Sequence, residues 1–417
     1  MKRFILISLW TGLVFGAAGP VSAVVGQGTE EERLDSVLRA TKPAAWETPP
    51  GNHHRLYLDI YNVTDFWDFE TLGVPQINDR TILADTIRPT ATILWDERFR
   101  IQAGVIAEKS YGADPEIIDV DPWLQLLWQP TRSLNVVMGD LDTPHYYLPA
   151  LLYETSYIQR QALPATISPL ILNNDVNAPQ NRNHETGMQL LLKKPNWYDD
   201  LFFNYYGIDT PTNNEQFDWG YIHRNELWNF FRFNYQFHWR HEGGESNPHP
   251  INVINDVAQA IGGGVFYDIV PPFRLGANIL YLHSHYRIDA SDTSKNITQN
   301  GNGQMYEAYA RYKHFKLLYT YWRGLGFFTK DGNPAYTLPR LIITSLRWDV
   351  LNSPDFNLLA EFSGYFVGNN DQGVDRRFKP VFHIQASWQF SLPIVEWTTP
   401  AASPQGVPIP TRWDYGI

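Results

Sequence analysis

The chain has 417 residues, a formal net charge of −11 and no cysteine. The lack of cysteine excludes disulfides, thiolate metal sites and covalently attached c-type haem, and the acidic charge argues against a nucleic-acid partner. Aromatic residues make up 15% of the chain although the mean hydropathy is −0.33. That combination is typical of membrane barrels, whose loops and lumen are polar and whose interfaces carry aromatic girdles.

The N-terminal residues predict export from the cytoplasm. Lys2 and Arg3 precede a mostly apolar run, and residues 21–23 form a small-x-small cleavage site, so residues 1–23 read as a signal peptide. Residues 24–52 are expected to form a periplasmic extension with a short amphipathic helix, because Thr29 and Glu32 have the spacing of a capping box. A helix that plugs a pore and a helix that mediates oligomer contacts are the alternatives.

The clearest strand signal lies at residues 231–240, where five aromatic residues alternate with five polar ones. A period of two indicates a β-strand, and about ten residues is the length of a strand that crosses a membrane. We expect the aromatic side to face lipid and the polar side to face the water of a lumen.

Similar alternation recurs from residue 53 to residue 391, with short turns alternating with long polar connections. About fifteen strands are visible, and because single-chain bacterial barrels have even numbers we predict 16, with 14 or 18 as alternatives. The uncounted strand would lie near residues 217–224 or 76–85. The last strand is expected over residues 380–390, followed by a Pro-rich tail at 392–417.

Residues 141–185 interrupt this pattern. The segment has no long alternating run and contains five prolines. Long connections inside ordered domains are usually functional or disordered. We predict a constriction loop that folds into the barrel, and an external lobe is the alternative.

The assembled pattern resembles the outer-membrane β-barrels of Gram-negative bacteria, in particular porins and substrate-specific or polysaccharide-exporting channels. The resemblance covers residues 54–391 and departs from the family pattern where the chain continues beyond Phe390. It implies a location in the cell outer membrane. The partners it implies are membrane lipid and lipopolysaccharide, the assembly machinery, small polar or saccharide solutes and, as an option, further copies of the chain, without nucleic acid.

These features predict an all-β channel for small polar or anionic solutes or saccharides; a structural or binding barrel, such as an exopolysaccharide-export component, is the alternative. Arg232, Arg240, Arg311 and Lys313 would form a basic stripe that favours anions, or else brace the wall against carboxylates. No enzyme signature is recognised, so we expect no catalytic residue, cofactor or metal, and no enzymatic activity. The predicted pore-lining residues are Arg232, Asn234, Gln236, His238, Arg240, Arg311, Lys313, His383, Gln385 and Gln389.

Overall fold

The structure, a computed structural model, describes residues 53–70, 80–95, 98–111, 118–131, 133–141, 145, 148, 150–151, 185–194, 196–207, 215–228, 230–243, 253–270, 272–289, 296–353, 355–367 and 378–398. Within these residues the chain forms sixteen strands and one short 3-10 helix. They are β1 (His53–Phe69), β2 (Arg80–Trp95), β3 (Phe99–Tyr111), β4 (Ile118–Thr131), β5 (Leu134–Asp140), β6 (Thr186–Lys194), β7 (Trp197–Gly207), β8 (Glu215–Leu227), β9 (Phe231–Gly243), β10 (Val253–Val270), β11 (Phe273–Asp289), β12 (Ile297–Tyr312), β13 (Phe315–Leu325), η5 (Pro334–Thr337), β14 (Arg340–Asn352), β15 (Phe356–Val367) and β16 (Lys379–Thr398).

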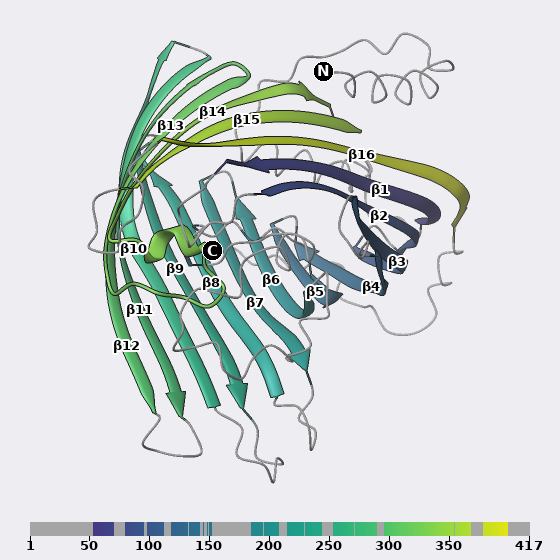
Figure 1. Ribbon diagram of the computed structural model, residues 1–417. Coiled ribbons are helices and arrows are strands. Elements are labelled where there is room, and N and C mark those ends of the chain that lie inside the picture. The colour runs from purple at the N-terminus through teal and green to yellow at the C-terminus, as the bar shows by residue number, and fades with distance from the viewer. Residues whose placement is uncertain are drawn as a thin grey trace.

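Each strand pairs antiparallel with its neighbours in the sequence, and β1 pairs with β16, so the sheet closes into a barrel (Figure 1). The predicted 16-strand antiparallel barrel is therefore confirmed. The strand that the sequence showed only weakly is β8, which covers the expected residues 217–224. Its aromatic and polar residues alternate, and a glycine at Gly220 weakens the pattern.

The outer face of the barrel is apolar. Along β12 and β13, Tyr306, Tyr312, Leu317 and Tyr319 are all more than a third exposed, while the residues between them face inward. A closed barrel leaves no unpaired strand edge, which is what a hydrocarbon surrounding requires. The protein is therefore a transmembrane β-barrel of the Gram-negative outer membrane.

The strand connections differ between the two rims of the barrel. At one rim, called here the short-turn rim, the gaps between strands are two or three residues, as at residues 195–196 and 313–314. At the other, the long-loop rim, the gaps are longer, as at residues 141–185 and 326–339. Among the described residues, no helix has the length and hydropathy needed to cross a membrane.

Strand β16 is longer than the sequence predicted. It continues past Phe390 to Thr398 because its final residues pair with the start of β1. A shift in register between Leu56 and Tyr57 accommodates an extra residue beside Pro393. Proline lacks the N–H that a regular ladder needs, so a bulge is where a strand tolerates it. The barrel boundary predicted at residue 391 is thus corrected to 398. The predicted signal peptide, the N-terminal helix and the tail from residue 399 lie outside the described residues.

Part of the lumen is filled with apolar side chains from two connections. The sequence predicted a constriction loop at residues 141–185, and it did not predict that residues 326–339 fold inward. Residues 326–339, here called the inward segment, fold between β13 and β14 into the barrel and include η5 (Figure 1). Its Ala335, Tyr336 and Leu338 pack against the wall, together with Leu148 and Leu151 from the connection between β5 and β6. The wall residues of this cluster are Phe202, Ile222, Ala258, Ala260, Leu280, Leu282, Met305, Trp322, Leu341 and Val367.

Trp322 is the largest fully buried side chain of this cluster, and it joins the inward segment to the wall. Its indole Nε1 donates to the carbonyl oxygen of Leu338 at 3.0 Å, and its ring packs edge-on against Tyr336. Gly303 on β12 leaves the room for this ring, because a Cβ there would lie 1.9 Å from an indole carbon. The inward segment is therefore fixed by packing as well as by hydrogen bonds.

We expect Trp322→Ala to lower the free energy of unfolding by about 3–5 kcal/mol, because it leaves a cavity and an orphaned carbonyl. The measurement is a denaturant titration of the folded protein in detergent micelles. Tyr319→Ala, an outward-facing change on the same strand, is the matched control and should cost at most about 1 kcal/mol. Equal losses for the two variants would contradict a packed lumen.

Candidate functional site

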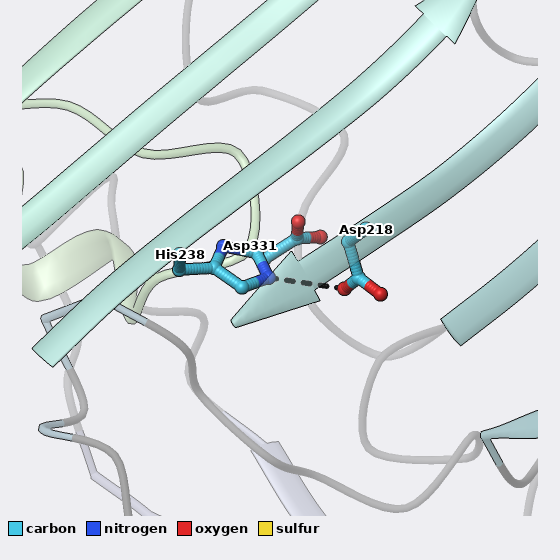
Figure 2. Close-up of side chains that lie close together, drawn as sticks. All are labelled: Asp218, His238 and Asp331. Carbon is cyan, nitrogen blue, oxygen red and sulfur yellow. Dashed lines mark hydrogen bonds and ion pairs between the residues drawn. The ribbon is translucent and has the colours of Figure 1, made fainter. Parts of the chain in front are cut away.

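Three ionisable side chains meet where the inward segment touches the wall, and we call them the central cluster. Asp218 comes from β8, His238 from β9 and Asp331 from the inward segment (Figure 2). His238 Nε2 lies 3.0 Å from Asp218 Oδ2. One ligand atom from each of the three side chains lies within 4.8 Å of the other two.

Strand register explains how β8 and β9 bring the first two residues together. Gly220 stands directly opposite His238 and carries no side chain. The imidazole can therefore point towards Asp218, which lies two residues before Gly220 on β8. Asp218 and His238 are 0% and 1% exposed, whereas the Asp331 side chain is 15% exposed. Solvent therefore reaches the cluster from the side of Asp331.

A network of charges holds Asp331 in place. Arg240 donates from Nη1 to Asp331 Oδ1 at 2.5 Å and from Nε to Glu242 Oε1 at 2.8 Å. The Lys330 ammonium donates to the same Glu242 oxygen at 2.6 Å, and its backbone N–H donates to Asp256. The position of Asp331 thus depends on wall residues of β9 and β10.

Carboxylates outnumber cations in this region. Among the described residues, four carboxylates, Asp218, Asp256, Glu242 and Asp331, contact the two cations Arg240 and Lys330 and the imidazole of His238. Asp256 Oδ1 is buried and, among the described residues, accepts no hydrogen bond. Buried negative charge is costly unless it is compensated. The region therefore favours a bound cation or the protonation of one of its groups.

Two kinds of chemistry fit the central cluster. An imidazole oriented by a carboxylate can act as a general base towards a water molecule, as in hydrolytic enzymes. One imidazole nitrogen and two carboxylate oxygens are also a ligand set that divalent transition metals accept. The sequence did not point to Asp218, His238 and Asp331 as a metal site, because the two aspartates lie on other elements than His238.

A second buried histidine lies nearby, in the connection between β5 and β6. His145 Nε2 lies 2.6 Å from Glu185 Oε2, and Nδ1 lies 2.8 Å from Asp200 Oδ2. Its ring stacks on Phe202 at a centroid distance of 3.8 Å. Burial alone would lower the pKa of His145, but the Asp200 and Glu185 carboxylates raise it well above its usual value. The ring is therefore an imidazolium that donates from both nitrogens.

This arrangement makes the stability of the protein depend on pH. The stabilisation from His145 is complete below its unfolded pKa of about 6.5 and is lost as the pH rises through the higher folded value. We expect the stability advantage of the wild type over His145→Gln to be largest near about pH 6 and to shrink towards about pH 10. Denaturant titrations at the two pH values measure it. An advantage that grows with pH would show that the ring is neutral in the folded state.

The structure places most of the predicted pore-lining residues on inward-facing strand positions. Gln236, His238 and Arg240 are covered by the two connections that enter the lumen, and Gln236 accepts a hydrogen bond from the Leu148 N–H at 2.8 Å. They therefore do not face open water as expected. Lys313 lies in the tight turn between β12 and β13, with a φ of 52°, and not in a strand.

The remaining predicted residues lie away from the central cluster. Arg232 donates to Glu226 across the β8–β9 pair, and the side chains of His383 and Gln385 both contact Asp65 Oδ1, at 3.1 and 3.0 Å. Asn234, Arg311 and Gln389 occupy partly buried inward positions on β9, β12 and β16. Among the predicted residues, only His238 belongs to the central cluster.

Asp218, Asp331 and His145 are not among the residues predicted from the sequence. Asp218 does lie in an alternating stretch, between Phe217 and Trp219, so strand periodicity could have placed it on the polar face with His238. Asp331 sits in a connection that looked like an ordinary polar loop. No local pattern reveals that such a loop folds inward.

Comparison with known proteins identifies a family. A protein-family model described as lipid A 3'-O-deacylase-type matches residues 48–393. No curated protein matches the chain. The family is one of enzymes, so the prediction that the protein has no enzymatic activity is wrong.

Solved outer-membrane proteins resemble the chain at low sequence identity. OccAB3 from Acinetobacter baumannii is 8% identical, with a TM-score of 0.43 over 81% of this chain and 99% of that chain. A loop-deletion mutant of OmpT from Vibrio cholerae is 9% identical, with a TM-score of 0.44 over 81% and 100%. A triple mutant of the Rhodopseudomonas blastica porin is 11% identical, with a TM-score of 0.41 over 80% and 100%. Similarities at this level carry no functional information.

Proposed function

The chain belongs to the lipid A 3'-O-deacylase-type family, and we propose that it is an outer-membrane hydrolase that cleaves an acyl ester of a lipid A-type glycolipid. The observation that carries the proposal, beside the family match, is the central cluster. It combines a carboxylate-oriented imidazole with a second carboxylate at the solvent-accessible side. No residue of the predicted pore lining other than His238 is needed for it.

In the proposed reaction, His238 takes a proton from a water molecule while the water oxygen attacks the acyl carbonyl carbon. The bond between that carbon and the ester oxygen then breaks, and the imidazolium returns the proton to the leaving alkoxide. Asp218 orients the ring and stabilises its charged form. The products are a fatty acid and a glycolipid with one acyl chain fewer.

The surroundings of the cluster suit an acyl chain. The Phe202 ring centroid lies 6.5 Å from that of His238, and Phe202 belongs to the apolar cluster of the lumen. Asp218 and His238 are buried beneath the inward segment. A substrate must therefore pass this segment to reach the central cluster. The proposal therefore includes a displacement of Asp331 from Arg240 when substrate enters.

We expect His238→Ala to lower the deacylation rate by about 100-fold or more, because general base catalysis supplies a factor of that size. The assay incubates the purified protein in detergent with lipopolysaccharide and follows the released fatty acid and the glycolipid mass by mass spectrometry. His241→Ala is the matched control, since His241 lies three residues away on the same strand and contacts Asn255 on the outer face. A folded His238→Ala protein with wild-type activity would refute the assignment of His238.

A second candidate function, which does not exclude the first, is the passage of small polar or anionic solutes through the lumen. It is favoured by the inward polar positions near Arg232 on β9 and near Gln385 on β16, which are only partly buried. Passage would require the inward segment to move, because its Arg240–Asp331 contact ties it to the wall.

Planar bilayers test this second function. We expect the wild type to open rarely and Arg240→Gln, which breaks the contacts with Asp331 and Glu242, to open more often. The reason is that the loss of both charge-assisted hydrogen bonds weakens the attachment of the inward segment. Heat-modifiable migration on a gel checks that the variant is folded. Silence of both folded proteins would exclude a channel.

A further inference from the structure

The carboxamide of Gln236 on β9 is a buried polar group of which only one end has a partner. The residue is 0% exposed. Its Oε1 accepts a hydrogen bond from the Leu148 N–H at 2.8 Å. Its Nε2 is also buried and, within the part of the chain that the structure describes, has no acceptor. A buried donor without an acceptor costs free energy, so its presence in a folded protein calls for an explanation.

The contact with Leu148 fixes which way the carboxamide points. A backbone N–H can only donate, so the carboxamide oxygen must be the atom that faces it, and the NH2 group points away from it. In the strand register, Gln236 stands opposite Ile222 on β8 and Ala260 on β10, which are both buried. Neither of these apolar side chains can accept a hydrogen bond. The neighbouring strands therefore leave the NH2 group unsatisfied.

Gln236 and His238 are consecutive inward-facing residues of β9. Side chains two residues apart in a strand point to the same face, with their Cα atoms about 7 Å apart. Gly220, opposite His238, leaves room beside the imidazole. Phe202, whose ring centroid lies 6.5 Å from that of His238, and Ile222 both belong to the apolar cluster of the lumen. An acyl carbonyl group that enters this apolar surrounding is within reach of both the imidazole and the amide donor.

The proposed ester hydrolysis needs a hydrogen-bond donor at this place. When the water oxygen attacks the acyl carbon, an electron pair of the C=O bond moves to the carbonyl oxygen, which becomes an oxyanion. The carboxylates of Asp218 and Asp331 would repel this charge, and His238 is engaged as the base. A fixed amide donor stabilises an oxyanion most where water is excluded. The donor must therefore come from outside the central cluster.

We propose that Gln236 is the oxyanion-stabilising residue of this reaction, and the inference rests on the proposed function. Gln236 Nε2 donates to the carbonyl oxygen of the bound ester, and this hydrogen bond strengthens as the oxygen gains negative charge. When the C=O bond forms again, the alkoxide leaves with the electrons of the broken C–O bond and takes the proton from His238. The Gln236 side chain neither gains nor loses a proton.

The test is the steady-state rate at which the purified full-length protein in detergent deacylates lipopolysaccharide. We expect Gln236→Met, which removes the donor at similar side-chain length, to lower kcat by about 100-fold or more and to change KM by less than about threefold. Asn234→Leu is the matched control, because Asn234 is the next inward amide of β9 on the side away from His238. It should keep kcat within about threefold of the wild type.

A second variant separates catalysis from the anchoring of Leu148. Gln236→Glu keeps an oxygen that can accept from the Leu148 N–H, but it has no amide donor. At about pH 8, well above the usual pKa of a glutamate, we expect it to lose kcat as Gln236→Met does. If Gln236 only anchored Leu148, the glutamate variant would keep its activity.

Four outcomes would overturn the proposal. Wild-type kcat in a folded Gln236→Met or Gln236→Glu protein, as judged by its heat-modifiable band, refutes the assignment and leaves the proposed function standing. A higher KM at unchanged kcat would show that Gln236 only helps to bind the substrate. If neither variant folds, Gln236→Asn, which withdraws the donor by one methylene group, is measured in their place, and an unchanged kcat then refutes the assignment. A wild type that releases no fatty acid contradicts the proposed function itself, and the inference with it.

Discussion

The pairing of β1 with β16 is the interaction on which the rest of the structure depends. A strand edge in hydrocarbon would leave a row of N–H and C=O groups without partners, at several kcal/mol for each group. The two terminal strands remove that edge by pairing from His53–Thr398 to Phe69–Val381. The need to pair these groups explains why β16 continues through Pro393 by means of a bulge, although the local sequence alone indicates that the strand ends there.

Closure with sixteen strands creates a second constraint, because a barrel of this size encloses more space than its own wall side chains can fill. In this protein the chain fills part of that space itself. The wall positions that meet the inward segment and the β5–β6 connection are apolar, for instance Leu280, Leu282 and Trp322. The inward segment also brings Asp331 to His238. The packing of the lumen and the assembly of the central cluster therefore both depend on the position of this segment.

These constraints explain what could be predicted from the sequence. Alternation indicated the strand type, about fifteen of the strands and the orientation of β9, because a lipid-facing and a lumen-facing row differ in polarity, and the even strand number of bacterial barrels supplied the sixteenth. Alternation could not place Asp331, since the inward course of residues 326–339 depends on contacts with strands distant in the sequence, and it did not single out His145 within the predicted constriction loop 141–185. The expectation of no enzymatic activity is contradicted by the family match, and no local motif signalled it: the residues that meet at His238 share none.

The lumen holds two charged regions of opposite sign, and their separation decides how far they influence each other. Arg232, which shares the Phe266 ring with Arg274, and His238, in the central cluster, lie six positions apart on the same face of β9. At about 3.4 Å per residue this is roughly 20 Å. In physiological salt, charges in contact with water are screened over about 8 Å, so these two arginines and the central cluster act on a solute independently. Each region is therefore compensated where it lies: the carboxylates around the central cluster by Arg240 and Lys330, and the two arginines by Glu226 and Asp268.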